Sequence, residues 1–180
     1  MAASSDPNTI LSAFPYHQNY VDLSHIECST LLAFLPQPSL SQQLNIAFVG
    51  SGPLPLTSLC MLDIFPAARV HNIDRDLSAL AISKSLSERL GYADRMSFAC
   101  TDVSTKPGEH EGKTAWHEFD VMFLAALVGT NSTSKLAILE DLVKKLRSGA
   151  LIVARSAKGL RTVLYPVRIL CAYNEIQGCC

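Results

Sequence analysis

Short apolar runs of strand length alternate along the chain with segments in which apolar residues recur every three or four positions. Nearly continuous apolar runs are typical of strands covered on both faces, and the longer repeat is typical of amphipathic helices. Strands that alternate with helices predict a mostly parallel sheet with right-handed crossovers. The predicted strands are residues 44–50, 69–74, 97–102, 119–127 and 149–156, and the predicted helices are residues 22–34, 55–65, 77–90 and 134–146.

This order of elements predicts a doubly wound, Rossmann-like α/β fold behind a short N-terminal segment. Residues 1–43 hold one predicted helix, which ends before the stretch PQPS, and residues 44–180 are expected to form the Rossmann-like domain. Residues 104–118 are polar and contain glycine, so we expect a surface loop between the third and fourth strands. Only the stretch VRILCAYNEIQGCC, residues 167–180, remains for the edge beyond the fifth strand, and we expect the sheet to be incomplete there.

Composition narrows the class of protein. A chain of 180 residues with 48% apolar residues and a net charge of -1 has the size and apolar content of one globular domain. Lys and Arg are spread along the chain, which disfavours nucleic acid as a partner, and the longest apolar run is too short to cross a bilayer. We therefore expect a soluble cytoplasmic protein that acts on a small molecule, and the composition leaves its oligomeric state open.

The cysteines and histidines show no metal-binding pattern. The chain has six cysteines, without a C-x-x-C pair and without a histidine spacing suited to zinc. Several of the cysteines lie inside apolar segments, where a free thiol behaves as a small hydrophobic group. We therefore expect no metal site.

A glycine- and proline-rich loop, GSGPLP, follows the first predicted strand at residues 50–55. The first strand-to-helix turn of an open parallel sheet lies at the ligand crevice, and Gly50 and Gly52 allow a ligand to approach the main chain closely. A pyrophosphate needs several backbone N–H donors there, but Pro53 and Pro55 each remove one, and the loop has no Lys or Arg. Pro55 also replaces the third glycine of the dinucleotide pattern. The loop therefore favours a nucleoside without phosphates.

Two carboxylates end neighbouring predicted strands. Asp74 lies where a carboxylate that accepts hydrogen bonds from ribose hydroxyls is expected. Asp102 is suited to accept from an adenine amino group while Val103 touches the ring. Each alone is more often a solvated cap, but together with the glycine loop they predict an S-adenosylmethionine site. Asp76 competes for the ribose position, although its pattern favours a helix N-cap.

Several stretches of the sequence resemble the nicotianamine synthase family. They are FPYHQNYVDLS, IAFVGSGPLPLTSL, VHNIDRD, FDVMFLAALVG and GALIVARSAKGLRTVLYP, at residues 14–24, 46–59, 70–76, 119–129 and 149–166. The resemblance implies a methyltransferase-like fold that transfers the 3-amino-3-carboxypropyl group of S-adenosylmethionine to an amine. The products would be methylthioadenosine and nicotianamine, a metal chelator, or a related compound. The candidate cofactor-binding residues are Gly50, Ser51, Gly52, Pro53, Asp74, Asp102, Val103 and Ala125.

The resemblance also implies catalytic residues. In the family, a tyrosine of the F-P-Y-x-x-N-Y region and a glutamate from the helical segment before it line the reaction chamber. Tyr16 and Tyr20 match the tyrosine positions and are the candidate catalytic residues, with an aromatic clamp between the front helix and the sheet as the alternative. For the acid, Asp6 is a poor substitute in a flexible tail, and Glu27 would require the front helix to point inward.

Two arginines near the end of the fifth predicted strand are candidates for the substrate carboxylate. Arg155 and Arg161 lie in the stretch ARSAKGLR, where either would pair with the carboxylate of the aminocarboxypropyl group. An arginine that holds an acidic group of the chain itself is an equally good interpretation.

Two other functions stay open. An ordinary small-molecule methyltransferase shares the predicted fold, although the stretch FPYHQNY favours aminocarboxypropyl transfer. A truncated, non-catalytic paralogue that binds S-adenosylmethionine, or packs against a full-length partner, is favoured by the short front segment and the irregular tail.

Overall fold

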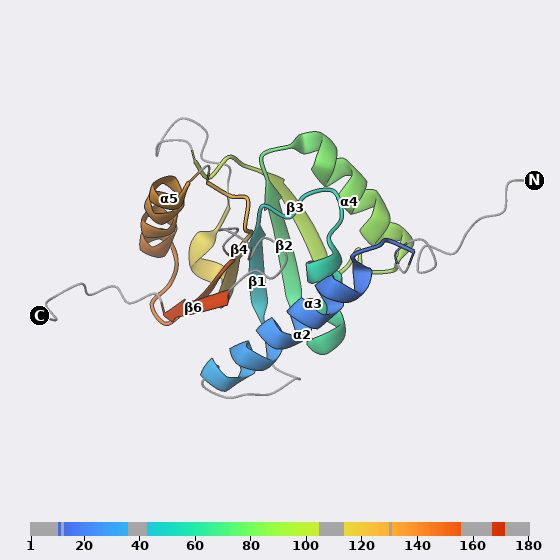
Figure 1. Ribbon diagram of the computed structural model, residues 1–180, viewed down its shortest axis with the longest axis horizontal. Helices are drawn as coiled ribbons and strands as arrows, with labels where there is room; N and C mark the ends of the chain where they lie inside the picture. The colour runs from blue at the N-terminus through green and yellow to red at the C-terminus, as the bar shows by residue number, and fades with distance from the viewer. Residues whose placement is uncertain are drawn as a thin grey trace, which may run out of the picture.

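The computed structural model describes residue 11, residues 13–35, 43–104, 114–129 and 131–155, and the backbone of residues 167–171. Its sheet has six strands in the order β3-β2-β1-β4-β5-β6 (Figure 1). Strands β1 to β5 are parallel, and β6 pairs with β5 in the antiparallel direction. The predicted doubly wound α/β fold is confirmed. The strands are β1 Asn45–Val49, β2 Arg69–Asp74, β3 Met96–Cys100, β4 Val121–Leu124, β5 Leu151–Arg155 and β6 Val167–Cys171.

Helices cover both faces of this sheet. Alternate residues of β1 point to opposite faces, because Ile46 and Phe48 join one hydrophobic cluster while Ala47 and Val49 join the other. The first cluster includes residues of α2 and α3, which lie side by side in front of the sheet in Figure 1, and the second includes residues of α5. The helices are α2 His17–Phe34, α3 Leu56–Ile64, α4 Leu77–Arg89 and α5 Ser132–Lys145, with a 3-10 turn, η1, at Trp116–Glu118.

Helix α2 and strand β6 differ most from the prediction. Helix α2 begins at His17 rather than at residue 22, because Asp22 is not its cap but accepts a hydrogen bond from Gln18 within the helix (2.7 Å). Tyr16, at the true N-cap, gives no side-chain cap, so the usual sequence signal for a helix start is missing. Strand β6 was not predicted at all, since a lone edge strand in a short apolar stretch has little periodicity to show.

Helix α2 packs into the same hydrophobic cluster as the sheet. Its buried residues are Ser24, Glu27, Cys28 and Leu31, and Cys28 and Leu31 share that cluster with residues of β1. The predicted division of the chain at residue 43 therefore stays a prediction. Within the described residues, no helix has the length and apolar content that a membrane span requires.

Candidate functional site

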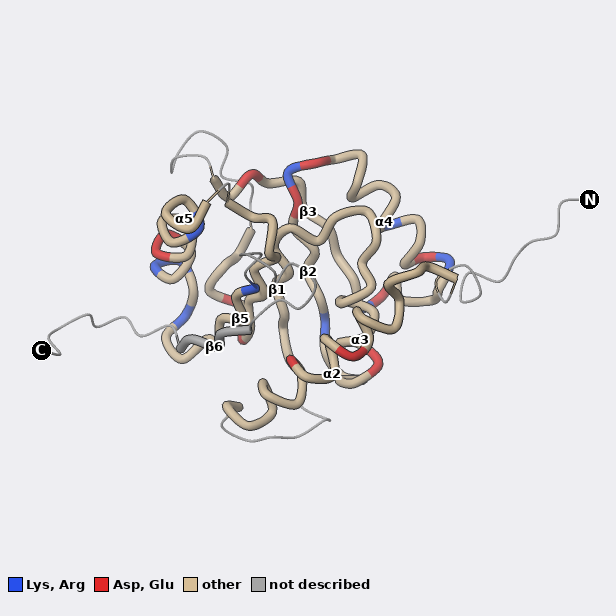
Figure 2. The backbone as a smooth tube through the Cα atoms, in the orientation of Figure 1, with Lys and Arg blue, Asp and Glu red and all other residues tan. Residues whose placement is uncertain are grey.

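A cavity of about 280 Å³ lies where β1, β2, β3 and β4 end. Ligands of open parallel sheets bind at this edge, beyond the carboxyl ends of the strands. Figure 2 shows acidic positions at the upper edge of the sheet, beside the end of β3. Six of the eight predicted cofactor-binding residues line this cavity, namely Gly50, Gly52, Asp74, Asp102, Val103 and Ala125.

The glycine loop forms one wall of the cavity. Gly50 and Gly52 both have positive φ angles, of 80° and 65°, which glycine adopts without strain. A β-carbon on Gly50 would overlap the side chain of Val128, whereas the same position on Gly52 faces open space. Gly50 therefore lets the loop after β4 approach, and Gly52 serves the turn itself.

Asp74 joins the glycine loop to the end of β2. Its Oδ2 accepts the backbone N–H of Gly52 (2.8 Å), and its Oδ1 accepts that of Asp76 (3.0 Å). Each carboxylate oxygen keeps a second lone pair, so these two bonds orient the group and leave acceptor capacity toward the cavity. Asp76 accepts from the backbone N–H groups of Ser78 and Ala79 as the N-cap of α4, so its predicted capping role is confirmed.

Asp102 and Val103 form the wall beyond β3. The Ser104 side chain and backbone both donate to Asp102 Oδ1, at 2.5 and 2.9 Å. These hydrogen bonds hold the pKa of Asp102 below its ordinary value, so its carboxylate is an ionised acceptor at neutral pH. Val103 lies in the same lining and offers an apolar contact, as the sequence predicts.

The other two residues of the predicted loop set lie away from the cavity. Pro53 is exposed and does not line it. Ser51 is buried, and its hydroxyl has no hydrogen-bond partner among the residues that the structure describes. Neither residue lines this cavity, and their role in cofactor binding stays a prediction.

The loop between β4 and α5 forms the wall opposite Asp102. It contributes Ala125, Leu127, Val128 and Gly129, and Leu127 is 83% exposed. Lys135 of α5 donates from Nζ to the carbonyl oxygens of Ala125 (2.6 Å) and Ala126 (2.9 Å). Burial lowers the pKa of Lys135 from its ordinary value to about 8.

Lys135 is not among the residues predicted from the sequence, although the sequence contains one signal for it. A lysine one turn into a helix is unfavourable beside the positive end of the helix dipole, so it needs another reason to be there. The two carbonyl groups of the preceding loop supply that reason.

The two predicted catalytic tyrosines lie on α2 and its N-cap, and neither lines the cavity. Tyr16 is 63% exposed, and Tyr20 packs partly buried against the hydrophobic cluster of α2 and α3. Both contact the ring of Phe14, at centroid distances of 5.8 and 6.4 Å. Tyr20 therefore fits the alternative interpretation, an aromatic clamp between the front helix and the sheet, whereas Tyr16 is too exposed to act as one. The catalytic role of both residues stays a prediction.

Glu27 and Arg155 form a buried ion pair between α2 and β5. Arg155 donates from Nε and from one terminal nitrogen to the two carboxylate oxygens of Glu27, both at 2.7 Å, and also donates to the Thr57 hydroxyl (3.0 Å). Glu27 has no exposed surface, and Arg155 is 4% exposed. The arginine thus holds an acidic group of its own chain, and the front helix does turn Glu27 inward. Arg161 lies outside the described residues.

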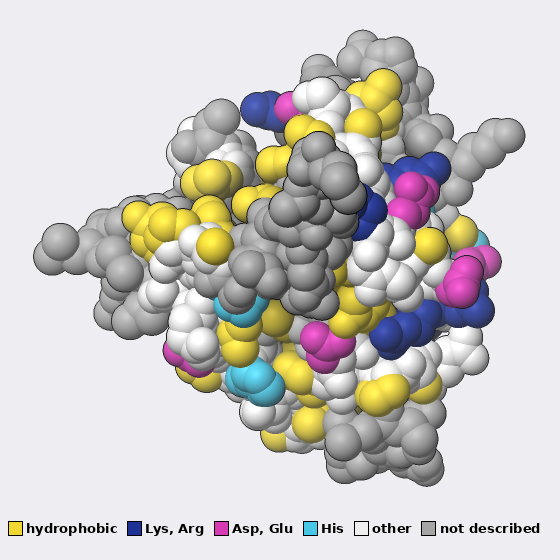
Figure 3. Space-filling view, turned by 90° about the vertical axis from the view of Figure 1, so that its right-hand side faces the viewer, with side chains coloured by type: hydrophobic (Ala, Val, Ile, Leu, Met, Phe, Trp, Pro, Cys, Tyr) yellow, Lys and Arg dark blue, Asp and Glu magenta, His cyan; other side chains and the backbone are white. Residues whose placement is uncertain are grey.

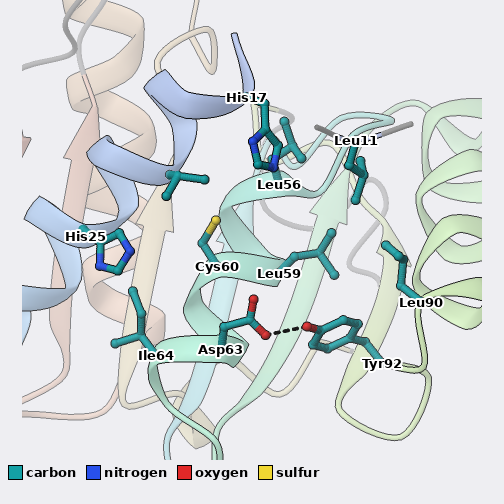
Figure 4. Close-up of a pocket in the computed structure, with 11 residues that line it drawn as sticks. Leu11, His17, His25, Leu56, Leu59, Cys60, Asp63, Ile64, Leu90 and Tyr92 are labelled. Atoms are coloured by element: carbon teal, nitrogen blue, oxygen red, sulfur yellow. Dashed lines mark hydrogen bonds between the residues drawn. The ribbon is translucent and has the colours of Figure 1, made fainter. Parts of the chain in front are cut away.

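A second, larger cavity of about 600 Å³ lies over α3, between α2 and the end of α4 (Figure 4). Leu56, Leu59 and Ile64 give it an apolar floor, and the hydroxyl of Tyr92 donates to Asp63 at its base. Burial, with help from Asp63, raises the pKa of Tyr92 to about 12, so the phenol stays protonated. None of the predicted site residues lines this groove, which we call the α3 groove.

Within the described residues, no group of three or more His, Cys, Asp or Glu side chains is placed to hold a metal ion.

Figure 3 shows acidic and basic side chains mixed on one face of the molecule, without a region of a single sign.

Comparisons with known proteins agree with one another. The family model described as "Nicotianamine synthase protein" matches residues 1–178. Nicotianamine synthase 2 of Arabidopsis thaliana is 37% identical over 164 residues, which are 90% of this chain and 48% of that protein. Nicotianamine synthase 9 of Hordeum vulgare is 40% identical over 175 residues, which are 93% and 47% of the two chains. The chain spans about half the length of the curated relatives it matches.

Some solved structures with similar folds contain S-adenosylmethionine or are described as dependent on it. A mutant of MtNAS in complex with S-adenosylmethionine has a TM-score of 0.67 and 23% identity, and the match covers 92% of this chain and 56% of that one. The S-adenosylmethionine-dependent methyltransferase SibL has a TM-score of 0.55 and 19% identity, over 79% and 39% of the two chains. At these identities the likeness shows the fold, which is that of S-adenosylmethionine-dependent methyltransferases.

Proposed function

Because the chain belongs to the nicotianamine synthase family, we propose that its sheet-edge cavity binds S-adenosylmethionine as the donor of a 3-amino-3-carboxypropyl group. One observation carries the proposal: Gly52, Asp74, Asp102 and Val103, chosen from sequence for a nucleoside, line a single cavity. The relatives are named nicotianamine synthases, and the solved MtNAS complexes contain S-adenosylmethionine in one case and MTA with tNA in another.

The dimensions and chemistry of the cavity suit the nucleoside part of this donor. Its volume of about 280 Å³ is just below the range of about 300–1,000 Å³ that is usual for small-molecule sites. The amino-acid part of the donor would therefore extend past the exposed Leu127. Asp74 would accept hydrogen bonds from the ribose hydroxyls, and Asp102 from the adenine amino group. Val103 and Val128 would contact the faces of the base.

The proposed reaction is a nucleophilic displacement. The lone pair of a neutral amine forms a bond to the sulfonium-linked carbon of the aminocarboxypropyl group. The carbon–sulfur bond breaks, its electrons pass to sulfur to leave methylthioadenosine, and the amine gives up a proton to a base. The chain's part is to fix the nucleoside, so that this carbon and not the methyl group meets the amine.

Two residues of the front helix are proposed for the acceptor side. Tyr16 and Tyr20 would face the amine of a ligand that extends beyond the cavity, and Tyr16 is exposed to solvent. The product would be nicotianamine, a metal chelator, or a related compound with a different acceptor amine. Arg161 is the remaining candidate for the substrate carboxylate, because Glu27 already occupies Arg155.

A non-catalytic S-adenosylmethionine-binding protein is the second candidate function. The observation that favours it is the separation of the nucleoside cavity from Tyr16 and Tyr20, neither of which lines it. The cavity itself would be unchanged under this alternative.

One incubation distinguishes these functions. Purified protein is mixed with S-adenosylmethionine, and the nucleoside product is identified by mass spectrometry. We expect methylthioadenosine, and S-adenosylhomocysteine would instead show a methyltransferase. Absence of product, with S-adenosylmethionine binding detected by calorimetry, would support the non-catalytic alternative. The Asp63→Asn variant, altered only in the α3 groove, is the matched control and should give the wild-type result.

A further inference from the structure

Lys135 holds the loop that forms one wall of the sheet-edge cavity. Its Nζ donates to two successive carbonyl groups, those of Ala125 at 2.6 Å and Ala126 at 2.9 Å. Hydrogen bonds from a charged donor are shorter and stronger than those between neutral groups. The side chain therefore ties the start of the loop to helix α5, which is anchored in the hydrophobic cluster through Ile138 and Leu142.

Close packing holds the same loop at two further points. A β-carbon on Gly129 would lie 2.9 Å from backbone atoms of Lys135, so the end of the loop rests directly on the lysine. On the cavity side, Val128 occupies the space left by the missing side chain of Gly50. The loop is thus held between the first turn of α5 and the glycine loop.

The position of Lys135 in the first turns of α5 is electrostatically unfavourable, and its contacts with the loop offset that cost. Cations are unfavourable near a helix N-terminus, and α5 is already capped there by Asn131 and Ser134. No salt bridge to Lys135 is found among the described residues, although Asp120, Asp141 and Glu140 lie on the same or neighbouring elements. Its partly buried ammonium is therefore held by the two carbonyl groups.

We propose that Lys135 is a positioning residue that fixes the β4–α5 wall of the cavity and thereby sets its affinity for the nucleoside part of the ligand. The part of this proposal that concerns ligand affinity rests on the proposed function. Lys135 itself does not touch the ligand, because it is absent from the cavity lining.

The test uses the Lys135→Met variant, which keeps the aliphatic chain and loses the donor. Lys144→Met, an exposed lysine on the same helix, is the matched control, and Lys135→Arg restores a charged donor. Hydrogen exchange of the backbone amides at residues 125–129 is measured without ligand. Calorimetry then gives the dissociation constants for S-adenosylmethionine and methylthioadenosine.

We expect Lys135→Met to accelerate exchange at residues 125–129 more than in β1 or β5, and to weaken both ligands by about tenfold. Equal losses for the two ligands would place the effect at the nucleoside, which they share. Lys144→Met should match the wild type, and Lys135→Arg should recover part of the loss.

Unchanged exchange in the loop, or an affinity within about twofold of the wild type, would overturn the inference. A uniform rise in exchange over the whole chain would also overturn it, because it would show a general loss of stability. Failure of the wild type to bind either ligand would refute the proposed function instead. The exchange measurement needs no ligand and would still decide whether Lys135 holds the loop.

Discussion

The cavity at the sheet edge and the front helix α2 are built by different means. The cavity is assembled from turns that follow parallel strands. Backbone hydrogen bonds connect these turns, such as the one from the N–H of Gly52 to Asp74. Helix α2 is attached through apolar packing on α3 and one buried ion pair, Glu27 with Arg155, whose members are 128 residues apart. The fold alone therefore creates the sheet-edge cavity, whereas the proposed acceptor side depends on how one helix is held.

The largest expected effect is the loss of that buried ion pair. Arg155→Ala leaves the Glu27 carboxylate buried without a cation, and breaking a buried pair in this way costs about 3–5 kcal/mol. Urea unfolding measures the change in the free energy of unfolding. Arg147→Ala, which breaks the exposed pair with Asp120, is the control and should cost about 0–1 kcal/mol. Equal effects of the two variants would show that Glu27 does not depend on Arg155.

Gly50→Ala should come next, because it disturbs the cavity in two ways. The new β-carbon would overlap Val128, and alanine would have to adopt a φ of 80°. Together, overpacking and left-handed strain predict a loss of about 2–4 kcal/mol of unfolding free energy. Gly52→Ala meets only the strain, since its β-carbon faces open space, and should cost less. Thermal unfolding of both variants checks the order, and a larger loss for Gly52→Ala would contradict it.

Asp74→Asn should lower ligand affinity with a smaller effect on stability. The neutral amide presents one acceptor oxygen instead of two charged ones. Either the ribose hydroxyls or a backbone N–H of the loop therefore loses its acceptor, and the other keeps only an uncharged one. The expected loss in S-adenosylmethionine affinity is about 10–100-fold by calorimetry. Asp76→Asn keeps a good helix cap and lies outside the cavity lining, so it should bind as the wild type does. A similar loss for Asp76→Asn would move the ribose contact to that residue.

The smallest effect is a pH dependence from Lys135. Its pKa is about 8 in the folded protein against an ordinary value of 10.5, so between these values the unfolded chain binds more protons. The lysine's contribution to the free energy of unfolding therefore rises as the pH increases from about 8 to 10.5. Tyr92 and Cys28, whose pKa values are raised to about 12, act in the opposite direction at high pH.

The contributions of Tyr92 and Cys28 cancel in the difference in unfolding free energy between the wild type and Lys135→Met. Urea unfolding of both proteins at about pH 7.5, below the window, and at about pH 9.5, inside it, should show the difference shifting in favour of the wild type. A constant difference across this range would show that the ammonium is not destabilised by burial.

Sequence reasoning succeeded where the relevant physics is local. The apolar runs identified β1 to β5, and the residues that end β1, β2 and β3 were brought together because parallel strands share an edge. The Glu27–Arg155 pair could not be assigned from the sequence, since it depends on how α2 is turned against β5. Lys135 was missed because its partners are backbone carbonyl groups, which every residue carries.

The most direct test of the account is to map the nucleoside on the protein by NMR. Methylthioadenosine is titrated into the labelled 19.5 kDa protein, and shifts of backbone amides are followed. We predict shifts at Gly50, Gly52, Val103 and Val128, and none at Leu59 or Tyr92 of the α3 groove. Shifts confined to the α3 groove, or no shifts at saturating nucleoside, would contradict a nucleoside site at the sheet edge.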